Sequence, residues 1–259
     1  MALRLDPQFP LLWRTPQSLQ FGLDRPRAVL ESVSPAEERL IAALVAGVSS
    51  SGMQMIGRSV GLDEPAIGAL ISALQPALEE KSPRPYPPSV MVIGAGKTAE
   101  LVKQLLLQAG VTVLLKDCEE PPAIVVIVAH FVIEPEAHGK WLRRDIPHLG
   151  VVFGDEVVRI ASIVRPGAGP CLYCLELHRT DSDPSWPAIA SQLLNRRSGI
   201  ETSLVAGEVA AIIARKVLAR QVVRAGEPMT MLEIDVSTGD RQTRNWAFHP
   251  DCGCASLNP

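Results

Sequence analysis

The pattern of apolar and polar side chains divides the first part of the chain into short strands followed by helices. Ser18 to Leu23 alternates between polar and apolar residues, which is typical of a strand with one buried face. Leu11 to Arg14 and Ala28 to Val33 are two further short strand candidates. Thr15 to Gln17, with its central proline, predicts the turn between the first two strands.

Helical signals follow these strands. Ser34, followed by a proline, is a typical helix N-cap, and Gly47 is a natural stop for that helix. Gln54 to Val60 is a candidate for a second helix, and Glu64 to Lys81 for a third. Three small strands and three helices predict a winged-helix-like α+β element over residues 1–80.

Prolines mark the boundary after this element. Lys81 to Ser89 contains four prolines in nine residues, which fit neither a helix interior nor a central strand. We read this segment, residues 81–89, as an extended and semi-rigid linker. It predicts two domains, residues 1–80 and residues 90–259.

Unalternating apolar runs open the second domain and are typical of buried parallel strands. Ser89 to Ile93, Val111 to Leu115 and Ala123 to Val128 are such runs, and an amphipathic helix ending near Gln108 lies between the first two. This alternation predicts a Rossmann-type α/β domain. Past Gly150 the pattern predicts a hairpin, a long apolar helix and a second hairpin: Val151 to Phe153 with Val157 to Val164, Ser203 to about Val223, and Met231 to Val236 with Arg241 to Phe248.

The composition is that of a globular protein. The 259 residues are 47% hydrophobic and 20% charged, which excludes an intrinsically disordered chain. The net charge of −3 gives no electrostatic footprint for wrapping duplex nucleic acid. The longest apolar run, Ala123 to Ile133, is shorter than the ~20 residues of a membrane span. No apolar signal region opens the sequence, so we expect a soluble, cytoplasmic protein.

Four of the five cysteines form two close pairs. The pairs are a CxxC and a CxC: Cys171 with Cys174, and Cys252 with Cys254. Structural zinc sites use four such ligands in a tetrahedron, and the glycine between the last two cysteines leaves the backbone free to aim both sulfurs. The pairs favour a structural zinc site over unrelated thiols, with His178 and His249 close enough to act as substitute ligands.

A glycine-rich turn follows the first buried run of the second domain. Gly94, Gly96 and Ala99 fit the G-x-G-x-x-G/A pattern between a strand and a helix. Asp117 lies 23 residues after Gly94, where a carboxylate can bind a ribose hydroxyl. This spacing is typical of nucleotide binding. The alternative is a tight strand-to-helix turn that packing alone requires.

The groups that activate a carboxylate with ATP are missing around this turn. Such chemistry needs Mg²⁺ ligands and positive charge over the phosphates. The strand after Asp117 ends at Val128 to Phe131 without a carboxylate. Glu134 and Glu136 are expected in a proline-containing loop, where either could be a metal ligand but a solvated charge is the commoner case. We therefore expect a vestigial nucleotide site that does not use ATP.

Several segments of the sequence resemble a known family. Gly169 to Pro187 and Trp246 to Cys254, around the two cysteine pairs, resemble the ThiF/MoeB-like (ubiquitin-activating-enzyme-like) proteins of thiazole/oxazole-modified microcin clusters. These proteins, here of the actinobacterial type, are leader-peptide-binding partners of cyclodehydratases in the biosynthesis of ribosomally made peptides. Pro10 to Thr15 and Gln20 to Asp24 resemble their N-terminal peptide-recognition element, so the resemblance covers nearly the whole chain.

The resemblance implies a fold, a metal and a function. The fold is a winged-helix-like peptide-recognition element followed by a ThiF-like α/β domain whose C-terminal part is stapled by structural zinc. The implied zinc ligands are Cys171, Cys174, Cys252 and Cys254. The implied function is that of a non-adenylating scaffold, which binds a leader peptide and presents it to a YcaO-type partner enzyme. A homodimer is the default expectation.

The peptide is expected to add a strand to a sheet edge of the first domain. The third strand and the third helix would form the groove, with five candidate lining residues: Val29, Leu30, Ile67, Ile71 and Leu74. The alternative is that these residues form the core of the small domain. Two other functions stay open: an ATP-dependent adenylyltransferase of the ThiF/MoeB type acting on a carrier protein's C-terminus, and a winged-helix DNA-binding regulator with a sensor domain.

Overall fold

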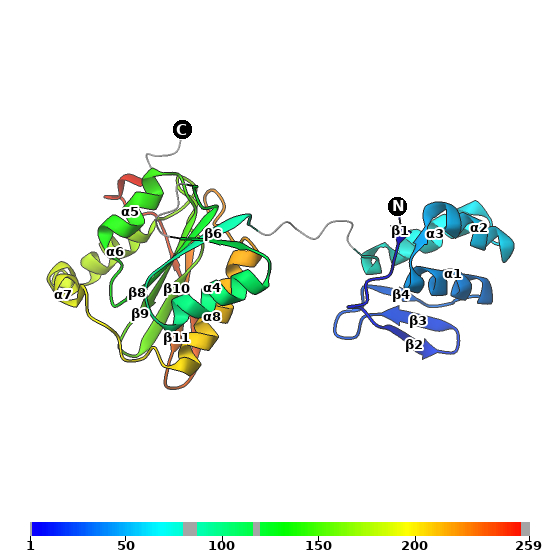
Figure 1. Ribbon diagram of the computed structural model, residues 1–259, viewed down its shortest axis with the longest axis horizontal. Coiled ribbons are helices and arrows are strands. Elements are labelled where there is room, and N and C mark those ends of the chain that lie inside the picture. Colours follow the sequence, from blue (N-terminus) through cyan, green and yellow to red (C-terminus); the bar gives the residue numbers. More distant parts are fainter. Residues whose placement is uncertain (1, 80–86, 116–119, 255–259) are drawn as a thin grey trace. The chain divides into compact units, whose positions relative to one another are not determined.

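The computed structural model describes residues 2–79, 87–115 and 120–254 (Figure 1). The chain divides into two compact units, Met1–Arg84 and Pro85–Pro259. Residues 81–86 of the expected linker lie outside the described residues, and so does Asp117. The domain boundaries expected from the prolines therefore stay a prediction, and each unit is described by itself.

The small unit combines two antiparallel sheets with helices. Its elements are β1 (Ala2–Leu3), β2 (Leu11–Thr15), β3 (Ser18–Phe21), β4 (Ala28–Leu30), α1 (Pro35–Ala46), β5 (Val48–Ser49), α2 (Ser50–Ser59), α3 (Glu64–Leu74) and the 3-10 helix η1 (Gln75–Ala77). Strands β2, β3 and β4 form one sheet in that order, which leaves β4 at an edge, and β1 pairs with β5. The three expected strands and three expected helices are present, while their winged-helix assignment stays a prediction.

Local chemistry explains where these helices begin and end. The Ser34 hydroxyl accepts a hydrogen bond from the backbone N–H of Glu37, whose carboxylate accepts one from the N–H of Ser34, so α1 starts with a capping box. α3 stops at Leu74, well before the expected Lys81, because Pro76 has no N–H to continue the helix. The core of the unit is formed by apolar side chains from sheet and helices, including Leu19, Phe21, Leu40, Leu44 and Ile67.

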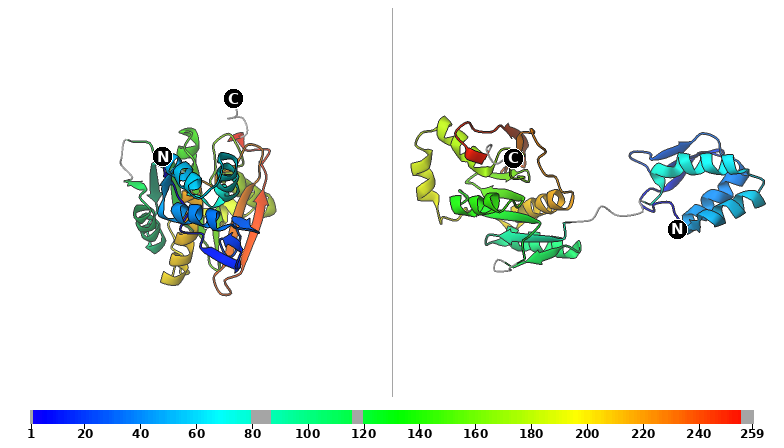
Figure 2. Two further views of the ribbon diagram at one scale, coloured as in Figure 1. Left: turned by 90° about the vertical axis from the view of Figure 1, so that its right-hand side faces the viewer. Right: turned by 90° about the horizontal axis from the view of Figure 1, so that it is seen from above.

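The large unit is built on a seven-stranded mixed sheet (Figure 2). Its strands are β6 (Ser89–Ile93), β7 (Thr112–Leu114), β8 (Ile124–His130), β9 (His148–Phe153), β10 (Val157–Ala161), β11 (Met229–Asp235) and β12 (Arg241–Trp246). They lie in the order β12-β11-β10-β9-β8-β6-β7, and the pairs among β7, β6, β8 and β9 are parallel while the others are antiparallel. The expected parallel strands and both expected hairpins are confirmed.

Helices cover both faces of this sheet (Figure 1). They are α4 (Lys97–Gln108), α5 (Pro135–Arg143), α6 (Leu172–Ser182), α7 (Trp186–Leu193) and α8 (Ser203–Leu218). α4 and α8 pack side chains such as Val102 and Val209 on one face, whereas α5 and α6 pack Trp141 and Leu172 on the other. The result is a three-layered α/β unit. Among the described residues, no helix is long and apolar enough to cross a membrane.

The sequence pattern misplaces some of these helices. It does not predict α5, α6 or α7. Glu134 and Glu136 do not lie in a loop, because Pro135 starts α5 and places one glutamate at its N-cap and the other in its first turn. α8 ends at Leu218, before the expected Val223. The chain then takes a φ angle of 47° at Arg220, which is incompatible with a continuing right-handed helix.

Candidate metal centre and glycine loop

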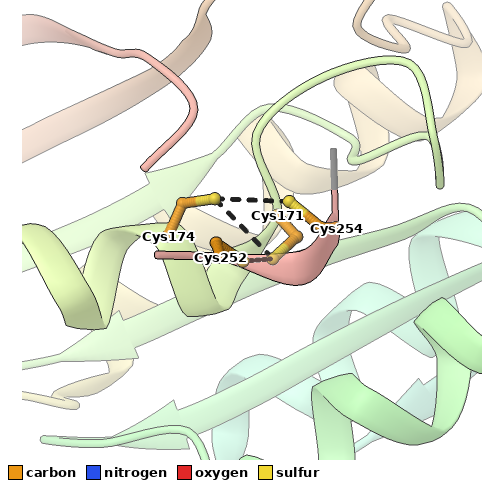
Figure 3. Close-up of side chains that lie close together, drawn as sticks. All are labelled: Cys171, Cys174, Cys252 and Cys254. Carbon is orange, nitrogen blue, oxygen red and sulfur yellow. Dashed lines mark hydrogen bonds between the residues drawn. The ribbon is translucent and has the colours of Figure 1, made fainter. Parts of the chain in front are cut away.

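The four paired cysteines lie together in the large unit (Figure 3). Cys171 is the N-cap of α6 and Cys174 lies in its first turn, whereas Cys252 and Cys254 follow β12. The sulfur-to-sulfur distances are 3.9 Å for Cys171–Cys174, 3.6 Å for Cys171–Cys252 and 3.4 Å for Cys174–Cys254. All four sulfurs lie within 4.8 Å of one another, so the structure brings together the two pairs that the sequence singles out.

The spacing of the sulfurs fits a metal ion and does not fit disulfides. A disulfide needs sulfurs ~2.05 Å apart. Sulfurs that bind one zinc ion at ~2.3 Å lie ~3.8 Å from one another in a regular tetrahedron, close to the spacing found. All four side chains are buried, with exposed fractions of 6% or less. The cluster can therefore hold a metal ion such as zinc, and its four sulfurs alone complete a tetrahedron.

Hydrogen bonding within the cluster makes the thiols unequal. Hydrogen bonds from Cys171 and then from Cys254 lower the pKa of Cys174 well below its usual range. The pKa of Cys171 is raised, first by its hydrogen bond with Cys174, then by that with Cys254 and by burial. Cys174 also lies in the first turn of α6, where the helix dipole favours an anion. Both effects favour the thiolate form of Cys174, which is the form that binds a metal ion.

His249 supports the cluster from outside. Its backbone N–H donates a hydrogen bond to the sulfur of Cys174, and its carbonyl accepts one from the N–H of Cys252 at 3.0 Å. Its ring Nε2 lies 2.8 Å from the carboxylate of Asp181, and its centroid lies 4.8 Å from that of His178. The two histidines expected as substitute ligands thus lie in a second layer around the cluster, where the four sulfurs already make a complete set of ligands.

The glycine loop turns sharply between β6 and α4. Gly94 and Gly96 have φ angles of 125° and 131°, which favour glycine. A Cβ atom at Gly94 would overlap the carbonyl oxygen of Val128. A Cβ atom at Gly96 would overlap Oε2 of Glu201 and lie 2.8 Å from its Oε1. Contacts within the protein, with Val128 and Glu201, therefore require glycine at both positions.

The Glu201 carboxylate lies at the start of α4. Its Oε1 accepts a hydrogen bond from the backbone N–H of Thr98 at 2.8 Å, and its Oε2 lies 3.6 Å from Nε2 of His130 at the end of β8. The exposed fractions of the Glu201 and His130 side chains are 9% and 11%. Sequence reasoning missed both residues, because no local pattern links Glu201 to a backbone N–H 103 positions earlier.

An open cleft of about 850 Å³ lies beside this loop, at the carboxyl ends of the parallel strands. Gly94 and His130 line it together with apolar side chains of β6, β7 and β8. Its charged side chains are Lys103, Glu134, Arg196 and Arg197. Open α/β sheets commonly bind ligands at this position, and the volume suits a small molecule. No local motif points to the two arginines, which lie between α7 and α8.

The five residues expected to line a peptide groove divide into two groups. Ile67 and Leu74 of α3 are fully buried in the core of the small unit. Val29 of β4 is 37% exposed, and Leu30 and Ile71 are partly buried. α3 packs against β4, so the partly exposed residues lie on neighbouring elements.

Comparisons with known proteins agree on the architecture. No protein-family model matches the sequence, and no similar curated protein is found. The heterocyclase TruD superposes with a TM-score of 0.71 at 14% identity over 99% of this chain, which spans 43% of the TruD chain. E. coli MccB, solved with MccA, gives 0.62 at 12% identity over 98% of this chain and 100% of its own. A chain of the E. coli microcin synthetase McbBCD complex gives 0.51 at 13% identity over 97% and 99%. The resemblance read from the sequence is thus confirmed at the level of the fold, which this chain shares with the heterocyclase TruD, with MccB and with a chain of the microcin synthetase McbBCD complex.

Proposed function

We propose that this chain is a non-adenylating ThiF-like scaffold that binds the leader segment of a substrate peptide and presents it to a YcaO-type modifying enzyme. The shared fold supports a role in peptide modification, since structures with this fold include a heterocyclase and a microcin synthetase complex. A second structure of the McbBCD complex holds pro-MccB17. A homodimer stays a prediction.

The edge strand β4 is the observation that carries this proposal. An edge strand presents unpaired backbone groups along one side, to which an extended peptide can add as a further strand. In β4, Ala28 points into the core, Val29 is 37% exposed and Leu30 is partly buried. Ile71 on the adjacent α3 adds a further partly buried apolar side chain. Such a rim can bind apolar side chains of the peptide while the strand binds its backbone.

The buried residues of α3 have a different role in this proposal. Ile67 and Leu74 are fully buried, so they anchor α3 to the small unit and set its position beside β4. The residues that contact the peptide are then Val29, Leu30 and Ile71. The metal acts in the other unit, where it ties the segment after β12 to α6 through sulfur ligands that leave no position for a substrate.

Peptide binding by the full-length chain tests the proposal. The probe is the fluorescently labelled leader peptide encoded beside the gene, and the readout is anisotropy. We expect saturable binding that Val29→Asp weakens by about tenfold or more, because a carboxylate would be desolvated beneath the peptide. Val45→Asp is the matched control, since Val45 is an exposed valine on α1. Wild-type protein without binding, or equal losses in both variants, would contradict the proposal.

The open cleft favours one alternative, an ATP-dependent adenylyltransferase of the ThiF/MoeB type. Lys103, Arg196 and Arg197 bring positive charge to a site of nucleotide size. ATP–pyrophosphate exchange in the presence of the peptide separates the two functions. The scaffold function predicts no exchange above the rate without protein, and the adenylyltransferase function predicts peptide-dependent exchange.

A further inference from the structure

Glu201 occupies the part of the glycine loop where a phosphate group would bind. Glycine loops at helix N-termini bind phosphate because the backbone can approach closely and its N–H groups point at the anion. In this chain the closest group to Gly96 is the Glu201 carboxylate, which leaves no room for even a Cβ atom. The N–H of Thr98 at the start of α4 donates to the same carboxylate at 2.8 Å. The space beside Gly96 and the N–H of Thr98 are therefore both taken by one side chain.

We propose that Glu201 is a built-in anion that closes the glycine loop against nucleotide phosphates. This inference rests on the proposed non-adenylating function and supplies its physical cause. A carboxylate carries the charge that the helix N-terminus stabilises. A phosphate would have to displace it or lie against it as a second buried anion, and either change is unfavourable.

The surroundings of Glu201 are built to keep the carboxylate in place. Its second oxygen faces Nε2 of His130 at 3.6 Å, and this ring is itself held at Nδ1 by the backbone N–H of Ser198 at 3.4 Å. α8 begins directly after Glu201, with Thr202 as its N-cap. The positive ends of two helices, α4 and α8, therefore meet near this one carboxylate.

The chain segment that carries Glu201 is anchored on both sides. Before it, the Ser198 hydroxyl donates to the carbonyl oxygen of Gly154 at 2.5 Å. After it, Nζ of Lys97 donates to the hydroxyl of Ser203 at 3.0 Å. Lys97 follows the glycine loop directly and would otherwise be available to a phosphate. Lys97, the basic residue next to the loop, is thus hydrogen-bonded to Ser203, two residues after Glu201.

The neighbouring cleft explains why a single residue can control nucleotide binding. It keeps about 850 Å³ and the side chains of Lys103, Arg196 and Arg197. The cleft therefore still offers space and positive charge for a nucleotide, whereas Glu201 fills the glycine loop beside it. Removal of the Glu201 side chain should therefore open the loop and allow binding.

Calorimetric titration of the full-length chain with ATP and magnesium tests this inference. Wild-type protein should show no saturable binding, and Glu201→Ala should bind ATP at least about tenfold more tightly than any residual wild-type binding. Glu208→Ala is the matched control, because it removes a glutamate of α8 that pairs with Arg241 away from the loop. It should behave as the wild type. Folded Glu201→Ala protein without gain in affinity, or an equal gain in Glu208→Ala, would overturn the inference.

A second readout uses wild-type protein alone and covers the case in which Glu201→Ala does not fold. The amide of Thr98 should show the same NMR chemical shift with and without ATP and magnesium, because its hydrogen bond to Glu201 persists. A shift that saturates with ATP would show a phosphate at the loop and overturn the inference. Leader-peptide anisotropy on the same samples tests the scaffold function separately, since Glu201 lies in the large unit and β4 in the small one.

Discussion

The ring of His249 donates a hydrogen bond from Nε2 to the carboxylate of Asp181 at 2.8 Å, while its Nδ1 accepts one from the backbone N–H of Asp251 at 3.1 Å. These two bonds fix the neutral tautomer with the proton on Nε2. They also fix the turn whose backbone N–H donates to the sulfur of Cys174. One buried histidine thereby connects α6, the segment after β12 and the sulfur cluster.

We expect purified protein to contain one zinc ion per chain, and Cys252→Ser to lose it. Without the metal, the segment after β12 loses its tie to α6, so the melting temperature should fall by about 10 °C or more. Elemental analysis and thermal unfolding measure both effects. Cys118→Ser is the control because Cys118 belongs to neither pair. Metal-free wild-type protein that melts as the metal-loaded sample does would contradict a structural site.

His249→Asn should weaken zinc binding by about 10- to 100-fold and leave the protein folded, because outer partners orient the ligands without binding the ion. Competition with a chromophoric chelator measures the affinity. His178→Asn should have a smaller effect, since the ring of His178 hydrogen-bonds to the carbonyl of Ala247 at 3.1 Å and packs against the rings of Trp246 and His249, none of which is a sulfur ligand. A larger loss in His178→Asn would show that His178 is itself a ligand.

Gly94→Ala should destabilise the large unit by about 3 kcal/mol, since the new methyl group would overlap the carbonyl oxygen of Val128 at a strained φ angle. Gly110→Ala is the matched control: its φ angle is 80°, but nothing lies within 4 Å of the added carbon. It should lose only about 1 kcal/mol from backbone strain. Chemical denaturation gives both values, and equal losses would refute the close packing of the glycine loop.

The stability of the large unit should fall between pH 6.5 and pH 4 because of His138. Burial, followed by the charges of His148 and Arg143, lowers the pKa of His138 from 6.5 to about 4. In this interval the unfolded chain binds a proton that the folded protein does not bind, so folding loses up to about 3 kcal/mol as the pH drops.

His138→Phe isolates this contribution, since a phenyl ring can keep the stacking on Tyr173. Zinc release at low pH affects both proteins, so the quantity to compare is the difference between them. Denaturation with urea at several pH values should show that the variant loses less stability than the wild type. Identical pH profiles would mean that His138 does not titrate as its burial requires.

Sequence reasoning predicted the elements with strong local signals. The apolar runs of β6 and β8 and the cap at Ser34 were sufficient to place those elements. α6 was missed because its only buried residues, Leu172, Cys174 and Leu175, lie in its first turn. The rest of the helix is mostly polar, so no apolar residues recur at helical spacing along it. α7 carries apolar residues at helical spacing, namely Trp186, Ile189 and Leu193, but the element is only eight residues long and none of them is buried, so the pattern was too short to predict a helix.

The two candidate sites also differ in whether a local sequence motif marks them. The cysteine cluster could be predicted because each half is a short motif, and sulfur chemistry then requires the halves to meet. The contact of Glu201 with Gly96 and Thr98 has no such motif. This contact forms because the fold brings the start of α4 close to the start of α8, two segments that lie about 100 residues apart in the sequence.

Hydrogen–deuterium exchange of the full-length chain, with and without the leader peptide encoded beside the gene, tests the scaffold function most directly. Strand addition at β4 should slow exchange of the amides of residues 28–30 and of the neighbouring α3, and should leave residues 94–98 unchanged. Peptide binding that leaves residues 28–30 unprotected, or that protects the glycine loop instead, would contradict the account.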